Sequence, residues 1–249
     1  MIRRLAPCVV LMCLVAGATE PAAPVAGRNY RILNPAQPTT VQPGQIEVIE
    51  FFSIACPHCA EFEPYLQSWN KRKPANVVLV RLPAVFKAAH WKLLARTYLA
   101  LVDVGADEKV TPKLLQAIHS QPVTPEIARP LGEYVARSQR DDSAAMAEAE
   151  RTVVDAIGTY AHGIAGVDPA RFRAAYYSFS VTARLAQYEQ VYRRYGVLGV
   201  PTIAVDGRYL SSVGPDYGNS LEGLVRTLDH LVDLEQKRIG GPRTQAAVH

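Results

Sequence analysis

Two cysteines separated by two residues, Cys56 and Cys59, are the side chains of this chain best suited to covalent chemistry. A thiolate can attack a disulfide, and a second thiol nearby can then resolve the mixed disulfide. The pair follows an apolar run, and Pro57 suits the first position of a helix because an N–H is not needed there. The spacing therefore predicts thiol–disulfide exchange at a strand-to-helix junction.

The two sulfurs are expected to play different roles. Cys56 would lie exposed at the helix N-terminus, where free backbone N–H groups, the helix dipole and His58 all favour a thiolate. We therefore expect a lowered pKa for Cys56, the nucleophile. Cys59 would lie one turn inside the helix, more buried, and keep its proton. Because a stabilised thiolate also stabilises the dithiol, the Pro57-His58 dipeptide bears on redox direction as well as on reactivity.

Other uses of a Cys-x-x-Cys pair fit this chain less well. Zinc needs two further ligands, and the other histidines show no paired ligand spacing (His90, His119, His162 and His230). A haem attachment site would place His directly after the second cysteine, where Ala60 stands. A purely structural disulfide over so short a loop would add little stability. We therefore expect no metal and no bound cofactor besides the Cys56–Cys59 disulfide.

The first 18 residues are typical of a secretory signal peptide. Arg3 and Arg4 form a basic segment, and Ala16-Gly17-Ala18 suits cleavage. Between them, the apolar run Leu5–Val15 is too short to span a bilayer. The mature chain would start near Thr19 and work in an oxidising compartment outside the cytoplasm. An uncleaved membrane anchor is the alternative.

The composition is that of a globular protein, with 49% hydrophobic and 20% charged residues in a chain of 249. Four cysteines are too few for a scaffold held by disulfides, and Cys8 and Cys13 would leave with the signal peptide. The formal net charge of +4 falls to +2 without the two arginines of the signal. A charge this small favours neither nucleic acid nor an anionic membrane as a partner.

The segments around the cysteine pair predict a β–α–β unit. Residues 46–52 are nearly all apolar, as in a central strand covered on both faces. A helix over 57–70 shows apolar residues at helical spacing, and Pro64 predicts a kink in it. Residues 77–82 form a second buried strand. A right-handed crossover would place the cysteines at the C-terminal end of the first strand, where open α/β sheets carry their sites.

The middle of the chain changes to helical patterns, with no strand expected from about 88 to 196. Apolar spacing predicts helices over 89–104 and 181–195, and an Ala- and Glu-rich stretch predicts one over 143–160. Three further helix starts are predicted where an N-cap residue precedes a proline, namely Thr111-Pro112, Thr124-Pro125 and Asp168-Pro169.

Strands return near the C-terminus, where Asp206-Gly207 between two short runs predicts a type I′ hairpin. A last helix follows, with Asn219 as its expected N-cap. This order predicts one α/β sheet whose two halves are separated by an inserted helical domain. The expected divisions are a signal peptide (1–18), a proline-rich lead-in (19–44), the first half (45–87), the helical insertion (88–180), the second half (181–239) and a tail (240–249).

Two separate motifs resemble the DsbA family of periplasmic disulfide oxidoreductases, a branch of the thioredoxin superfamily. The first is Glu50-Phe51-Phe52-Ser53 with Cys56-Pro57-His58-Cys59, and the second is Gly199-Val200-Pro201-Thr202. The resemblance covers most of the mature chain and is loosest over 121–168. It implies a thioredoxin-like fold with an inserted helical domain, and a periplasmic location.

The resemblance also assigns roles to residues outside the cysteine pair. It implies a cis bond before Pro201, facing the two cysteines, and a backbone at Val200 that pairs with an extended substrate strand. It implies that Glu50 is a buried carboxylate that helps to move the proton of Cys59. Without it, Glu50 would be read as an edge residue facing solvent. Arg81 stands where the family carries a lysine that pairs with this carboxylate.

The function implied is that of a monomeric dithiol oxidase, which donates its disulfide to newly exported proteins. A quinone-linked membrane protein of the DsbB type would then reoxidise it. A reductase or isomerase is the alternative, although exported isomerases usually carry an N-terminal dimerisation domain where this chain has only a short lead-in. A non-catalytic chaperone that binds peptides beside Val200 and Pro201 is a second alternative.

Overall fold

The computed structural model describes residues 22–140, 143–215, 217 and 219–240. The predicted signal peptide with its two cysteines lies outside these ranges, as does the tail after residue 240. Within them, five strands form one sheet in the order β1-β5-β4-β2-β3. The strands are β1 (Arg31–Ile32), β2 (Ile46–Phe52), β3 (Val77–Pro83), β4 (Thr202–Val205) and β5 (Tyr209–Ser212).

The central strand β2 carries the chain to the cysteines. All seven of its residues are buried, as expected for a strand covered on both faces. It runs parallel to β3 and antiparallel to β4, and its register places Glu50 beside Arg81 and Ile203. Helix α1 (Pro57–Arg72) links β2 to β3, so its N-terminus lies at the C-terminal end of the central strand.

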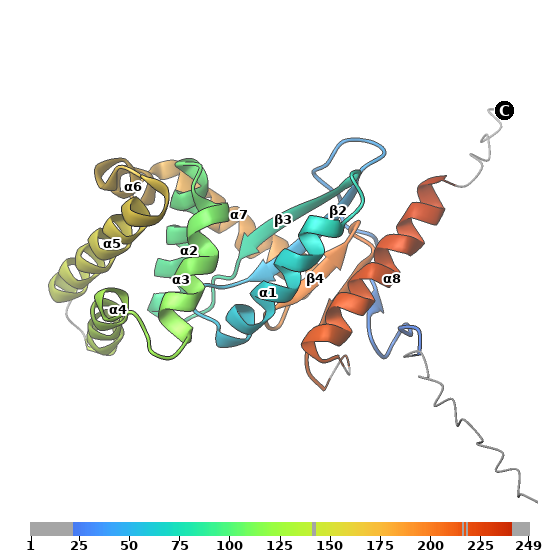
Figure 1. The fold of residues 1–249 in the computed structure, drawn as a ribbon, viewed down its shortest axis with the longest axis horizontal. Helices are drawn as coiled ribbons and strands as arrows, with labels where there is room; N and C mark the ends of the chain where they lie inside the picture. Colours follow the sequence, from blue (N-terminus) through green and yellow to red (C-terminus); the bar gives the residue numbers. More distant parts are fainter. Residues whose placement is uncertain (1–21, 141–142, 216, 218, 241–249) are drawn as a thin grey trace, which may run out of the picture.

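Helices cover both faces of the sheet (Figure 1). On one face, α1 and α8 (Leu221–Gly240) pack their apolar stripes on β2 and β4, with Phe62, Leu66 and Trp69 buried against Val48. On the other face lies α7 (Phe179–Tyr195), whose Tyr192 ring packs edge-on against Phe51 at 4.8 Å. Because side chains alternate along a strand, Val48 and Glu50 face α1 whereas Phe51 faces α7.

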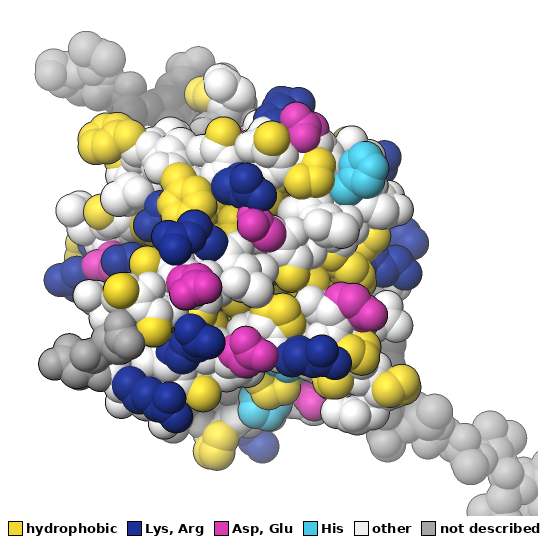
Figure 2. All heavy atoms as spheres, turned by 90° about the vertical axis from the view of Figure 1, so that its left-hand side faces the viewer, with side chains coloured by type: hydrophobic (Ala, Val, Ile, Leu, Met, Phe, Trp, Pro, Cys, Tyr) yellow, Lys and Arg dark blue, Asp and Glu magenta, His cyan; other side chains and the backbone are white. Residues whose placement is uncertain are grey.

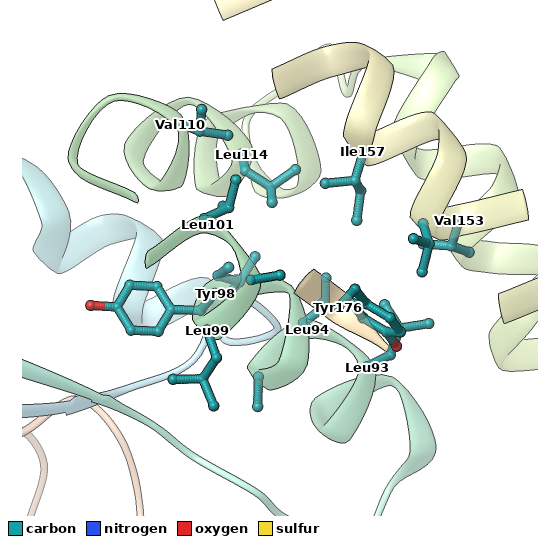
Figure 3. Packing of buried hydrophobic residues seen from close by; sticks show 14 of the residues in the cluster. Leu93, Leu94, Tyr98, Leu99, Leu101, Val110, Leu114, Val153, Ile157 and Tyr176 are labelled. Atoms are coloured by element: carbon teal, nitrogen blue, oxygen red, sulfur yellow. The ribbon is translucent and has the colours of Figure 1, made fainter. Parts of the chain in front are cut away.

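The inserted helices form a second body beside the sheet, to the left in Figure 1. They are α2 (Ala89–Asp103), α3 (Asp107–His119), α4 (Pro125–Arg137), α5 (Ser143–Ala165) and α6 (Pro169–Tyr176). Figure 3 shows their core, in which Leu94 and Leu101 of α2 lie near Leu114, Ile157 and Tyr176. The same apolar cluster includes both Cys56 and Cys59, so the helical body packs directly on the cysteine-bearing turn.

Most predicted elements are present, and two helix starts differ from the prediction. Pro112 does not begin a helix but lies inside α3, which starts at Asp107. The acidic first turn of α3 favours that earlier start because it faces the positive end of the helix dipole. Asn219 does not cap the last helix. Its amide instead donates to the carbonyls of Asn29 and Ser212, and the Ser220 hydroxyl accepts from the Gly223 N–H.

The hairpin between β4 and β5 has the geometry that its residues predicted. Asp206 and Gly207 both have positive φ angles, 48° and 62°, as a type I′ turn requires. The Gly207 carbonyl also accepts a hydrogen bond from the Gln37 N–H at 2.7 Å. A Cβ atom on Gly207 would lie 2.0 Å from the Gln37 carbonyl oxygen. The turn therefore needs glycine for both its φ angle and its space.

We expect Gly207→Ala to be far more destabilising than the matched substitution Gly105→Ala. Both glycines have positive φ angles, but a Cβ on Gly105 would meet nothing within 4 Å. Gly105→Ala should therefore cost about 1–2 kcal/mol of unfolding free energy, and Gly207→Ala about 1–3 kcal/mol more because of the clash. Urea unfolding of both variants measures the difference, and equal losses would contradict the clash.

Candidate active site

Cys56 occupies the N-cap position of α1, with extended backbone angles, and Pro57 is the first helical residue. The turn before it is held locally. The Ser53 carbonyl accepts from the Cys56 N–H at 3.1 Å, and the Ser53 hydroxyl accepts from the Ala55 N–H at 3.0 Å. The strand-to-helix junction therefore has its own hydrogen bonds, and these set where the first sulfur lies relative to the helix axis.

Both cysteines are free thiols in the structure, and both are buried. Cys59 is 1% exposed and its sulfur accepts from the Ser53 N–H at 3.4 Å. Cys56 is 5% exposed, so the expectation that it lies exposed is wrong. The reason is tertiary, because the helical body packs on this turn and the Val200 carbonyl lies 3.5 Å from the Cys56 sulfur. Pro57 and His58 are exposed beside it.

The two thiols differ in acidity as predicted, but chiefly for another reason. The pKa of Cys56 is lowered to about 6, first by a hydrogen bond from the Cys59 thiol. Burial opposes this lowering of the pKa, and the backbone N–H groups of Cys59 and His58 assist it, while the charge of His58 contributes least. Burial raises the pKa of Cys59 well above its usual value. The neighbouring thiol, rather than His58, therefore has the largest effect on the thiolate.

The second motif lies opposite the cysteines. The Val200–Pro201 bond is cis, as the resemblance implied, and it places the Val200 carbonyl against the Cys56 sulfur. The Thr202 hydroxyl donates to the Gly199 carbonyl at 2.7 Å, and the Ser212 hydroxyl donates to the Pro201 carbonyl at 2.7 Å. These bonds attach the loop to β4 and β5, so its position follows that of the sheet.

Glu50 is fully buried on the α1 face of β2, so its reading as a solvent-facing edge residue is wrong. One carboxylate oxygen accepts from the Arg81 Nε at 2.6 Å, as the resemblance implied for this pair. The other oxygen has no hydrogen-bond partner among the described residues. Burial raises the pKa of Glu50 to about 7, against the lowering effect of Arg81. The charge of Glu50 in turn raises the pKa of Cys59.

Two further residues at the site escaped the sequence analysis. Glu63 is buried on α1 and forms a second ion pair with Arg81, so one guanidinium lies between two carboxylates. The sequence does contain a pattern that indicates Glu63: a carboxylate four residues after Cys59, on a helix face that is otherwise apolar. The ring of His119, at the end of α3, donates from Nε2 to the Ile54 carbonyl at 2.8 Å. No sequence pattern joins residues 65 apart, so only the fold brings this pair together.

The described ranges contain no group of three or more His, Cys, Asp or Glu side chains placed to hold a metal ion. None of their helices is both long and apolar enough to cross a membrane. The groups gathered near the sulfurs are therefore the two thiols, the buried Glu50–Arg81–Glu63 cluster and the cis-proline loop.

A scan against protein-family models matched none. Among curated proteins, the thiol:disulfide interchange protein DsbA of Burkholderia cepacia is 34% identical over 230 residues, which cover 90% of this chain and 93% of that protein. This chain belongs to the DsbA family. The oxidoreductase DsbA from Xylella fastidiosa matches with a TM-score of 0.67 at 29% identity, covering 86% of this chain and 99% of that one.

The DsbA of Pseudomonas aeruginosa matches equally well, with a TM-score of 0.67 at 28% identity over 87% of this chain and 96% of that one. The predicted thioredoxin-like fold with an inserted helical domain is confirmed. The chain is a disulfide oxidoreductase of the DsbA family, as the cysteine motif and the cis-proline motif predicted.

We expect the Cys56 thiolate to titrate with a midpoint near pH 6 in the reduced protein. Cys59→Ala should raise this midpoint, because it removes the thiol that donates to the thiolate, and His58→Gln should raise it less. The titration midpoint of the wild type and of both variants is measured from the ultraviolet absorbance of the thiolate as a function of pH. A larger rise in His58→Gln than in Cys59→Ala would show that the imidazole has the main effect.

Glu50→Gln should stabilise the protein increasingly as pH rises. The pKa of Glu50 is raised from 4.5 to about 7 on folding, so the folded state holds a proton that the unfolded state releases in this range. Stability from this group is full below about pH 4.5 and is lost as pH rises through 7. The neutral variant lacks this loss, so its advantage over the wild type in urea unfolding should grow across that window.

The exposed residue Glu222 provides the matched control. The Tyr65 hydroxyl lowers the pKa of Glu222, so Glu222→Gln should show no such gain with rising pH. An advantage of Glu50→Gln that stays constant with pH would mean that Glu50 keeps an ordinary pKa in the folded protein.

Proposed function

We propose that this protein oxidises pairs of thiols in newly exported proteins of the periplasm, using the Cys56–Cys59 disulfide. The observation that carries the proposal is the asymmetry of the two sulfurs, one with a pKa lowered to about 6 and the other with a pKa raised by burial. A thiolate stabilised in the reduced protein makes the dithiol form more stable relative to the disulfide. The enzyme would therefore give its disulfide away readily.

The reaction proceeds by two exchanges. A substrate thiolate attacks Cys56 of the disulfide, a mixed disulfide forms, and Cys59 leaves with the electron pair. A second substrate thiolate then attacks the substrate sulfur of the mixed disulfide, and Cys56 leaves as the thiolate. The substrate has lost two electrons, and the enzyme has gained them as a dithiol. A thiol of low pKa leaves fastest, which suits Cys56 to the second exchange.

Glu50 would supply the proton that Cys59 takes up as it leaves. Its pKa of about 7 means that a proton is present on part of the population near neutral pH. The other Glu50 oxygen is buried and has no hydrogen-bond partner in the part of the chain that the structure describes, so it is available to hold that proton. Arg81 holds its proton permanently and would act by position and charge, not as part of a relay. It also lies 4.3 Å from the centre of the Phe52 ring, which restricts its movement.

Val200 and Pro201 would hold the substrate. The cis bond turns the backbone of Val200 toward Cys56, where an extended segment of an unfolded substrate can pair with it. Backbone pairing needs no particular side chain, and this suits an enzyme that acts on many proteins. His58 and Pro57 are exposed beside the sulfur and would contact the same segment.

The reduced enzyme needs an oxidant, which we propose is a membrane protein of the DsbB type linked to quinone. The predicted signal peptide supports the periplasmic location, and the name of the Burkholderia cepacia relative supports the exchange reaction. We propose a monomer that binds no nucleic acid. On the end of the molecule seen in Figure 2, acidic and basic side chains are interspersed, which fits the low net charge.

The equilibrium of the Cys56–Cys59 pair in glutathione buffers tests the oxidase direction. The disulfide should be reduced at far lower ratios of reduced to oxidised glutathione than a structural disulfide requires. A disulfide that resists reduction as strongly as that of thioredoxin would overturn the proposal and favour a reductase.

Two single variants separate the roles of the sulfurs. Cys56→Ser should abolish peptide oxidation. Cys59→Ala, first loaded at Cys56 with a mixed disulfide to glutathione, should exchange the glutathione for a substrate protein that has one reduced cysteine, and the mixed disulfide between Cys56 and that substrate should accumulate. A double Cys→Ala variant serves as the control for binding, since a chaperone would keep its protective effect on unfolded substrate without either sulfur. Residual oxidation by Cys56→Ser would contradict the mechanism.

A further inference from the structure

A groove lies beside residues 196–198, just before the cis Val200–Pro201 bond. It is lined by apolar and basic side chains to which the exchange reaction assigns no role. It has a volume of about 610 Å³ and lies between the loop after β3 and the C-terminal end of α7. Its wall includes Phe86, whose ring lies 4.9 Å from that of Trp91. Leu198 also lines the groove and is 93% exposed, so its side chain is open to a binding partner. We call this the basic groove, because its charged residues are mostly cations.

The charges of the basic groove are unbalanced. Lys87, Lys92 and Arg193 line it together with one carboxylate, Glu189. Glu189 lies 3.4 Å from Arg193, so that pair is neutral as a unit. The two lysines are exposed and have no carboxylate within ion-pair distance among the described residues. The groove therefore offers two cations next to an apolar surface, in a chain whose net charge is otherwise small.

The groove lies within reach of a substrate held at Cys56. Leu198 precedes Val200 by two residues, and the Val200 carbonyl lies 3.5 Å from the Cys56 sulfur. An extended chain advances about 3.3–3.6 Å per residue. A substrate cysteine at Cys56 would therefore bring residues two to four positions away onto Leu198 and into the groove.

We infer that the basic groove selects substrate segments in which an apolar side chain and acidic side chains lie within about four residues of the reactive cysteine. The apolar side chain packs on Phe86 and Leu198, and the carboxylates lie near Lys87 and Lys92. Lysine or arginine at the same substrate positions is repelled. This inference rests on the proposed oxidation of exported proteins and adds the class of segment that is oxidised fastest.

Matched dithiol peptides test the inference with the full mature protein. Each peptide carries two cysteines and one leucine, and two nearby positions are Glu-Glu in one peptide and Lys-Lys in the other. Oxidised enzyme takes two electrons and two protons from each peptide in a single turnover and becomes a dithiol. The reaction is followed by quenching with an alkylating agent and measuring by mass the fraction of peptide that has lost its two thiols. We expect the acidic peptide to react about tenfold faster at low salt, and the ratio to approach one at high salt.

Charge reversal locates the effect. The double variant Lys87→Glu, Lys92→Glu should invert the ratio of the two rates, and a ratio is insensitive to any general change in activity. The control Lys71→Glu, Lys237→Glu makes the same change in net charge at the C-terminal ends of α1 and α8. It should keep the wild-type ratio.

The outcomes are distinguishable from those of the proposed function. If neither peptide is oxidised, the oxidase proposal fails. If both are oxidised by the wild type at equal rates, or if both double variants change the ratio equally, the oxidase proposal stands and the selective groove is overturned.

Discussion

The hydrogen bond from the Cys59 thiol to the Cys56 sulfur is the interaction on which this protein depends. Cys56 and Cys59 lie one helical turn apart and buried, so the second thiol can donate to the first only because α1 begins where β2 ends. That single donor has the largest effect on the acidity of Cys56. The sheet, the cis-proline loop and the inserted helices all contribute by keeping this turn in place and shielded from water.

The inserted helices also form part of the surroundings of the two cysteines. Its core is continuous with the cysteines, and His119 at the end of α3 holds the carbonyl of Ile54, two residues before Cys56. Burial by these helices disfavours the thiolate form of both cysteines. It also widens the difference between their pKa values, because Cys59 is covered more completely than Cys56. The insertion thus belongs to the electrostatics of the site as well as to its architecture.

A buried guanidinium between two carboxylates is costly unless its partners are close, and here both are within ion-pair distance. Within the described ranges, this arrangement leaves one buried oxygen of Glu50 without a hydrogen-bond partner. The Arg81 guanidinium carries several N–H donors, which lets one side chain contact both Glu50 on β2 and Glu63 on α1. The cluster therefore ties the central strand to the cysteine-bearing helix.

Local sequence determined much of this protein. The apolar run of β2, the proline after Cys56 and the Asp206-Gly207 turn each specify backbone geometry through nearest neighbours, and all three are present. Two local signals failed for different reasons. Asn219 does not cap α8 because its side chain bonds to Asn29 across the fold, and Pro112 does not start a helix because another local feature, the acidic first turn, starts α3 earlier.

Only the tertiary structure decided the burial of Cys56, the second ion pair of Arg81 and the contact between His119 and Ile54. Each of these joins residues from different elements, and their approach depends on how the helices pack on the sheet. Spacing in the sequence can indicate which side chains could react. The solvent exposure and the charged neighbours that set their pKa values come from packing, which no local pattern encodes.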